Sequence, residues 1–236
     1  MLEGRGVRVV RGGKTILRGV DVAARAGEVL GVLGPSGAGK STLFGALTGE
    51  IALDGGSVYF ANEDVTRAPL WVRARAGLGY VPQTPSVLLD LTVRQNLATF
   101  RRVALGDAGD VEAAAARVDL RERLDVKAGS LSAGERRRLE LARAITASPK
   151  ALVCDEPFAG VDPAGAERLG QLLRALAKEE GVAVVLADHH VVEALRVCDV
   201  ASLLLDGAIA LTEPPGAFES HELVRGRYLG TLTDAR

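Results

Sequence analysis

One short segment constrains the fold more than any other part of the chain. It follows the phosphate-loop pattern G-x-x-x-x-G-K-[ST] and consists of Gly34, Pro35, Ser36, Gly37, Ala38, Gly39, Lys40, Ser41 and Thr42. A continuous apolar run at 29–33 precedes it, and an apolar stretch at 43–47 follows it and stops before Gly49. A buried strand, a glycine-rich loop and a helix, in that order, are the setting in which this pattern binds phosphate. The sequence therefore predicts a nucleotide-binding loop.

The residue types of this loop point to a triphosphate. Glycines let successive backbone N–H groups turn toward one anion, and the helix that follows adds partial positive charge. Lys40 is expected to reach the β- and γ-phosphates, and the Ser41 hydroxyl to bind Mg²⁺. The cofactors implied are ATP and Mg²⁺.

Further apolar runs at 151–154, 182–187 and 201–205 are continuous rather than alternating. Strands that are buried on both faces of a parallel sheet have this pattern. Between them, residues 163–180 repeat apolar positions with helical spacing, with Asp162 and Pro163 as the start of the helix and Gly181 as its end. The alternation of strands and helices predicts an α/β fold with a largely parallel sheet.

Two other regions differ from this alternation. Short strand patterns at 7–10, 20–22 and 57–60, separated by turn residues, predict antiparallel pairing. Residues 91–148 contain no strand pattern and are expected to be helical, with a loose connection at 106–109. We interpret them as a helical insertion into the α/β domain.

Polar side chains stand directly after two of the predicted strands. Asp155 and Glu156 follow 151–154, and Asp188, His189 and His190 follow 182–187. Because ligands of open α/β sheets bind at the carboxyl ends of the strands, these side chains are expected near the phosphate loop. Asp155 is expected to hold Mg²⁺ through water, Glu156 to polarise the attacking water, and His189 to contact the γ-phosphate. His190 is expected to be an ordinary capping or surface residue.

A serine–glycine motif, 131–135, precedes a helical stretch. Ser132 and Glu135 have capping-box spacing, and the same helix N-terminus could face an anion, so both interpretations stay open. The arginine run 136–138 is expected to form a solvated face rather than a binding patch. Cys154 and Cys198 stand among apolar residues and are expected to be buried thiols without a disulfide or metal.

Composition excludes several classes of protein. With 29 basic and 30 acidic residues the net charge is −1, which disfavours a nucleic acid as partner. No apolar run approaches the ~20 residues of a membrane-spanning helix, and the N-terminus lacks the apolar stretch of a signal peptide. The chain is therefore expected to stay in the cytoplasm, without a membrane span of its own.

Six motifs occur in the order found in ABC transporter ATPases, and the chain resembles that family from about residue 7 to residue 230. The phosphate loop corresponds to Walker A, 80–83 to the Q-loop, 131–135 to the signature, 152–157 to Walker B, 160–162 to the D-loop and 188–189 to the H-loop. The resemblance implies a P-loop NTPase (RecA-like) core with an antiparallel β region and an inserted α-helical subdomain. It implies one ABC ATPase domain over 1–236, with the core and β region at 1–90 and 149–236 and the helical subdomain at 91–148.

The family also implies a homodimer that encloses two ATP molecules. Ser132 and Gly134 of one copy would then face the Walker A loop of the other, with Asp162 of the D-loop at the nucleotide. Gln83 would bind Mg²⁺ and relay the nucleotide state to transmembrane permease subunits, which would hold the chain at the inner face of the membrane. Two positions depart from the family: Ala133 replaces a signature glycine, and Arg11 stands where an aromatic residue usually stacks on adenine.

Within the family, the chain is most similar to ATPases of bacterial lipopolysaccharide exporters. That likeness rests mainly on the stretches 73–83, 134–144 and 155–163 and on the tail Tyr228-Leu229-Gly230. The resemblance implies an ATP-hydrolysing motor subunit for lipopolysaccharide export. Two alternatives remain open: the ATPase of a branched-chain amino-acid importer, which shares the tail, and a nucleotide-binding interaction protein with little hydrolysis.

Overall fold

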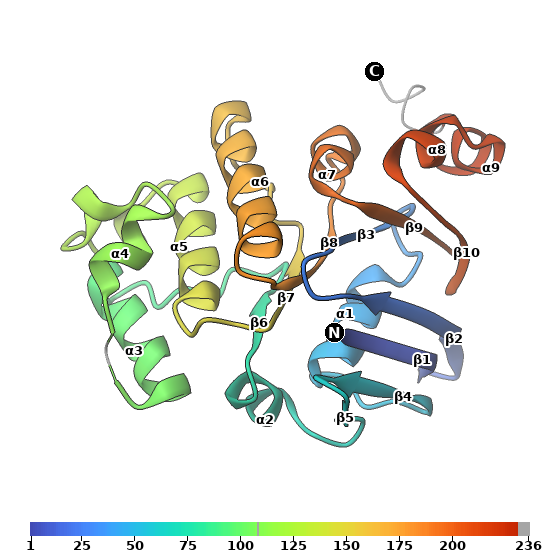
Figure 1. Ribbon diagram of the computed structural model, residues 1–236, viewed down its shortest axis with the longest axis horizontal. Coiled ribbons are helices and arrows are strands. Elements are labelled where there is room, and N and C mark those ends of the chain that lie inside the picture. The colour runs from blue at the N-terminus through green and yellow to red at the C-terminus, as the bar shows by residue number, and fades with distance from the viewer. Residues whose placement is uncertain (108, 231–236) are drawn as a thin grey trace.

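Two sheets of different character form the framework of the chain (Figure 1). The computed structural model describes residues 1–107 and 109–230. A six-stranded sheet has the order β10-β9-β3-β8-β7-β6, and its neighbouring strands are parallel except for β10, which pairs antiparallel with β9. A four-stranded antiparallel sheet has the order β2-β1-β4-β5. The predicted fold class, an α/β core with an antiparallel β region, is confirmed.

The six-stranded sheet contains all four of the predicted buried strands. They are β3 (Val29–Leu33), β7 (Ala151–Asp155), β8 (Ala183–Ala187) and β9 (Val200–Leu205). The two edge strands, β6 (Leu78–Val81) and β10 (Ala208–Glu213), were not predicted from the sequence. β6 has only four residues, one of them Gly79, and β10 alternates exposed with half-buried positions, so neither forms a continuous apolar run.

The strands of the antiparallel sheet are longer than the sequence patterns indicated. Its strands are β1 (Leu2–Arg11), β2 (Lys14–Ala24), β4 (Gly55–Phe60) and β5 (Glu63–Asp64). Irregularities in the β1–β2 register occur between Gly4 and Arg8 and again beyond Val9. Residues in this stretch, including two glycines, interrupt the simple alternation that marks a strand in the sequence.

Helix α1 (Lys40–Thr48) lies between the two sheets and begins directly at the phosphate loop. Its apolar side chains Leu43, Phe44 and Leu47 share one buried cluster with residues of both sheets. The helix ends at Gly49, whose φ of 85° is the left-handed conformation that favours glycine at a helix C-terminus. This packing holds the N-terminus of α1 at the carboxyl end of β3.

The remaining helices cover the parallel sheet or stand beside it. Helices α6 (Pro163–Lys178) and α7 (Val191–Val197) pack against it, as do α8 (Pro215–Ser220), α9 (Glu222–Val224) and the π-helical turn η3 (Arg225–Leu229) near the end of the chain. Asp162 caps α6 by accepting from Gly165 N, and Pro163 is its first residue, as predicted. Helix α2 (Leu70–Arg75) connects the two sheets.

Between 91 and 148 the described residues form helices and one isolated β-bridge. They comprise α3 (Val93–Leu105), α4 (Val111–Ala116), α5 (Ala133–Ile145) and the 3-10 turns η1 (Arg121–Arg123) and η2 (Ala128–Ser130). All of these elements except η1 contribute to one apolar cluster of their own, and the helices stand at one end of the molecule, away from the antiparallel sheet (Figure 1). The expected loose connection at 106–109 includes Ala108, which lies outside the described residues.

Two further expectations concern burial and the membrane. Cys154 and Cys198 are both buried free thiols, as predicted, and burial raises the pKa of each to about 12. Within 1–107 and 109–230, none of the helices combines the length and the apolar character needed to cross a membrane.

Candidate functional site

The phosphate loop curls around the ammonium group of Lys40. Lys40 Nζ donates to the carbonyl oxygens of Gly34, at 2.7 Å, and Pro35, at 3.0 Å. Only glycine fits at position 34, because a Cβ there would stand 2.2 Å from the carbonyl oxygen of Leu204. Gly39 has a φ of 109°, which leads the chain from the loop into α1. The loop thus places a cation and a helix N-terminus at one point, which is a binding site for an anion.

Burial governs the charge of this ammonium group. Lys40 is buried, and desolvation lowers its pKa, while the carboxylates of Asp155 and Glu156 act in the opposite direction. The nearby carboxylates therefore support the charged form in a place where burial disfavours it. A phosphate group brought into the loop would add further negative charge around the same nitrogen.

Four predicted site residues meet beside the loop, at the carboxyl edge of the parallel sheet. Gln83 follows β6, Glu156 follows β7 and His189 follows β8, so three strands bring them together. Gln83 Nε2 donates to Glu156 Oε1 at 2.8 Å, and His189 Nε2 lies 2.8 Å from the same oxygen. Ser41 Oγ donates to Gln83 Oε1 at 3.4 Å, which joins the phosphate loop to this cluster.

Glu156 stands in an unusual backbone conformation. Its φ is +56°, in the left-handed region that residues other than glycine rarely adopt. Its N–H donates to the carbonyl oxygen of Ala187 at 2.7 Å, which ties it to β8. The turn directs the Glu156 carboxylate toward Gln83 and His189, whereas the carboxylate of the preceding residue, Asp155, is buried.

Oxygen atoms suited to Mg²⁺ lie between the loop and this cluster. Asp155 is buried at the end of β7, and desolvation raises its pKa while a hydrogen bond with Ser41 and the charge of Lys40 lower it. Mg²⁺ in nucleotide sites takes one or two side-chain oxygens together with phosphate oxygens and water. The Ser41 hydroxyl, the Gln83 amide oxygen and the Asp155 carboxylate are oxygen ligands of that kind, so the residues fit the ion.

The serine–glycine motif forms the start of helix α5. Ser132 and Glu135 make the predicted capping box: Glu135 N donates to Ser132 Oγ, and Ser132 N donates to Glu135 Oε2. A Cβ on Gly134 would stand 3.3 Å from the carbonyl oxygen of Gly160, so the motif lies against the loop that carries Asp162. Among the described residues, no hydrogen bond joins Ser132 or Gly134 to the phosphate loop of the same chain.

The expectation of a solvated arginine face at 136–138 is wrong for Arg137. This residue is only 6% exposed, and its side chain donates to the backbone carbonyls of Pro82, Asp155 and Glu156. Consecutive residues of an α-helix project in different directions around its axis, so three neighbouring arginines do not share one environment. Arg137 points toward the sheet, and Arg136 and Arg138 stay half-buried.

Two further residues have contacts that the sequence pattern did not indicate. Asp188 is buried and accepts from Phe158 N at 2.9 Å and from His190 N at 2.8 Å, so it links the loops after β7 and β8. His190 Nδ1 also lies 2.8 Å from this carboxylate with half of its side chain exposed, in keeping with the local role expected for it. Tyr228 is buried and hydrogen-bonded to the backbone of Gly34, with its pKa raised to about 12 by burial. In the sequence, the tail motif Tyr228-Leu229-Gly230 was the one pattern that could have pointed to Tyr228.

Arg11 lies at the tip of the β1–β2 hairpin. Its side chain is exposed, and its guanidinium donates to the carbonyl oxygen of Val10 at 3.3 Å. The neighbouring strand β2 reaches the phosphate loop, because a Cβ on Gly39 would touch Leu17 and Ile16. The hairpin therefore borders the loop on the side of the antiparallel sheet.

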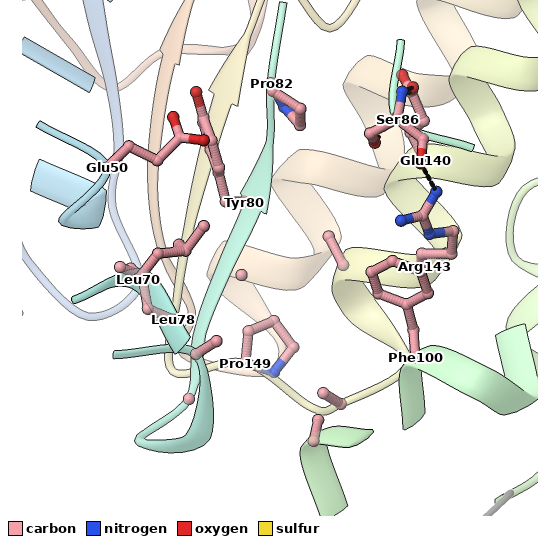
Figure 2. A pocket seen from close by; sticks show the side chains of 16 residues that line it. Glu50, Leu70, Leu78, Tyr80, Pro82, Ser86, Phe100, Glu140, Arg143 and Pro149 are labelled. Atoms are coloured by element: carbon pink, nitrogen blue, oxygen red, sulfur yellow. Dashed lines mark hydrogen bonds between the residues drawn. The ribbon is translucent and has the colours of Figure 1, made fainter. Parts of the chain in front are cut away.

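A cavity of about 420 Å³ opens between β6 and the helices α2, α3 and α5 (Figure 2). Apolar surface dominates its walls, with Phe100 on one side and Leu70 and Leu78 on the other. Arg143 lies over the Phe100 ring, 3.4 Å from its centre, and burial lowers the pKa of Arg143 to about 10. Its Nε atom is buried and has no hydrogen-bond partner among the described residues.

The chain is similar in sequence to known proteins over most of its length. The family profile described as "ABC transporter" matches residues 17–159. The lipopolysaccharide export system ATP-binding protein LptB of Acidithiobacillus ferridurans is 38% identical over 221 residues, which cover 92% of this chain and 91% of that protein. The LptB protein of Escherichia coli (strain K12) is 36% identical over 228 residues, with 92% of each chain covered.

The fold of this chain is also similar to solved structures of ABC transporter cassettes. The ADP conformation of MJ1267, an ATP-binding cassette of an ABC transporter, matches with a TM-score of 0.87 and 27% identity over 98% of both chains. The dimeric structure of MJ0796, a bacterial ABC transporter cassette, matches with a TM-score of 0.82 and 25% identity over 91% of this chain and 99% of that one.

Proposed function

The chain belongs to the ABC transporter family as an ATP-binding ATPase subunit, and from this premise we propose that it drives lipopolysaccharide export. Relatives with that printed function match at 34–38% identity and cover 92% of this chain. The single observation on which the assignment of ATP hydrolysis rests is the contact of Gln83 and His189 with one carboxylate oxygen of Glu156, beside Lys40 and Ser41. A chain that only binds nucleotide does not need this cluster.

The proposed chemistry assigns one task to each side chain. Lys40 and the amides of the phosphate loop hold the β- and γ-phosphates of ATP. Ser41 and Gln83, with Asp155 through water, would hold Mg²⁺, which would supply positive charge beside the phosphates. Glu156 accepts a proton from the attacking water, and His189 contacts the γ-phosphate. We further propose that the exposed Arg11 guanidinium stacks on the base, because a planar cation can lie against an aromatic ring.

The proposed assembly is a homodimer with ATP between its two copies. Gly134 lies against the 160–161 backbone directly before Asp162, and among the described residues no hydrogen bond joins Ser132 or Gly134 to the phosphate loop of the same chain. In the dimer, Ser132 and Gly134 of one copy bind the γ-phosphate held by the loop of the other, and Asp162 lies at the same interface. The γ-phosphate then joins the copies, and its hydrolysis releases them. Residues 91–148 act as the helical subdomain that presents the signature.

We propose that the cavity between β6 and α3 receives a segment of the transmembrane subunits. Pro82 lines the cavity directly before Gln83, so a partner seated there would lie next to the residue that contacts Glu156. The walls are apolar, and exposed side chains at Phe100, Val103 and Leu105 extend them along α3. The assembly would place the chain at the cytoplasmic face of the membrane.

Affinity purification from membranes, with identification of the bound subunits, tests this function. Ala104→Trp puts a large side chain at the cavity wall, and we expect at least a ~10-fold loss of co-purified membrane subunits, because about 1.4 kcal/mol of lost contact is tenfold in affinity. ATP hydrolysis by the isolated chain should stay within about twofold of the original. Ala23→Trp, on the exposed face of β2, is the matched control.

The bound subunits also decide the substrate. Co-purification of lipopolysaccharide export components supports the proposal, and co-purification of amino-acid importer subunits would replace it by that alternative. Equal capture by the Ala104→Trp and Ala23→Trp variants would exclude the cavity as the docking site while leaving the ATPase assignment intact.

A further inference from the structure

We propose that Arg137 is a positioning residue for hydrolysis: its guanidinium fixes the backbone that carries Glu156 and joins it to the segment that carries Gln83. The proposal rests on the proposed function, because it matters only if Glu156 accepts the proton of the attacking water. Arg137 belongs to helix α5, which starts at the serine–glycine motif. Among the described residues, none of the hydrogen bonds of Arg137 goes to the phosphate loop, so its effect must pass through the residues that it holds.

The contacts of Arg137 span two separate segments of the chain. Its Nη1 atom donates to the carbonyl oxygen of Pro82 at 2.7 Å, directly before Gln83. Its Nη2 atom donates to the carbonyl oxygen of Glu156 at 2.8 Å and to that of Asp155, and Nε donates to Glu156 O at 3.2 Å. One planar group therefore fixes the backbone on both sides of the Gln83–Glu156 contact.

The backbone of Glu156 needs such support. Its φ of +56° is unfavourable for a residue with a side chain and persists only where the surroundings hold it. Ala187 O accepts from Glu156 N at 2.7 Å, and Arg137 donates to Glu156 O. With both of its peptide groups held, the residue presents its carboxylate toward Gln83 and His189.

A partner on the same helix compensates the buried charge of Arg137. Glu140 is 4% exposed, and its Oε2 atom accepts from Arg137 Nη1 at 2.6 Å. The other oxygen of Glu140 accepts from Ser86 N at 2.6 Å, on the segment that leads from Gln83 to the cavity (Figure 2). The pair thus attaches α5 to the stretch 82–86 at two points, Pro82 and Ser86.

Arginine suits this position because of its shape. The guanidinium offers five N–H groups in one plane, and here they reach three carbonyl oxygens and one carboxylate oxygen. A lysine keeps the charge but donates from a single nitrogen, so it cannot hold both segments at once. Arg137→Lys therefore separates the geometry of the group from its charge.

The test measures hydrolysis and binding separately in the full-length chain. We expect Arg137→Lys to lower kcat for ATP hydrolysis at least ~10-fold while the Kd for ATP stays within about threefold, because the phosphate loop is untouched. Arg136→Lys, one position earlier and half-buried, is the matched control and should leave both values within about twofold. Should Arg137→Lys fail to fold, the double variant Arg137→Gln, Glu140→Gln removes both buried charges together and takes its place.

A double-mutant cycle separates positioning from general destabilisation. In single-turnover measurements, adding Arg137→Lys to a Glu156→Gln variant should change the residual rate less than about twofold, since the carboxylate that Arg137 positions is already absent. A further ~10-fold loss in that background, or an unchanged kcat in Arg137→Lys alone, would overturn the proposal. If Glu156→Gln itself leaves kcat unchanged, the part of the proposed function that makes Glu156 the proton acceptor fails instead, so the two failures are distinguishable.

Discussion

Replacing Glu156 with glutamine should lower kcat for ATP hydrolysis at least ~100-fold, which corresponds to about 2.7 kcal/mol of activation free energy. Glutamine has nearly the same shape but cannot accept a proton from water at neutral pH. The loop that binds the phosphates is unchanged, so ATP should still bind. Because hydrolysis no longer removes the γ-phosphate, ATP-bound dimers should accumulate.

Three measurements check this variant: phosphate release at steady state, equilibrium binding of ATP, and sedimentation with and without nucleotide. Glu167→Gln, an exposed carboxylate on α6, is the matched control and should behave like the original chain. An unchanged turnover in Glu156→Gln would remove Glu156 from the mechanism. A variant that no longer binds ATP would show instead that the carboxylate supports the nucleotide site itself.

Replacing Lys40 with methionine should weaken ATP binding at least ~100-fold. The buried ammonium group is the cation that the phosphate loop surrounds, and charged groups in such surroundings interact with phosphate far more strongly than exposed ones. Methionine keeps the length of the side chain and removes only the charge and its donors. Equilibrium binding of ATP in the presence of Mg²⁺ measures the effect directly.

Lys14→Met provides the comparison, because Lys14 is an exposed residue at the start of β2. It should bind ATP as the original chain does. Equal affinities of the Lys40→Met variant and the original chain would show that the phosphate loop does not hold the triphosphate through this ammonium group.

Local patterns were sufficient to predict the parts of the fold that depend on near neighbours. The strand, loop and helix from Val29 to Thr48 appeared as an apolar run, a glycine-rich motif and a second apolar stretch ending at Gly49. Likewise, the caps at Ser132 and Asp162 depend on residues three positions apart. Edge strands such as β10 escaped prediction because half of their surface faces solvent, which blurs the apolar pattern.

In the site, too, the residues marked by a local pattern were predicted, and those that depend on contacts distant in the sequence were not. The sequence placed Glu156 and His189 at the ends of strands, and strand order in the sheet explains why they meet. Arg137 was misjudged because its partners lie at Pro82 and Asp155–Glu156, far from it in the sequence. Its direction depends on how α5 packs against the ends of β6 and β7, which composition does not reveal. Asp188 and Tyr228 likewise act through distant backbone groups.

Phosphate release by the purified chain, followed over a range of ATP concentrations with Mg²⁺ and then with a chelator, tests the central claim most directly. The account predicts release that saturates with ATP and stops when Mg²⁺ is removed. A chain that binds ATP tightly in the presence of Mg²⁺ and releases no phosphate would contradict it, and would favour a nucleotide-binding interaction protein instead.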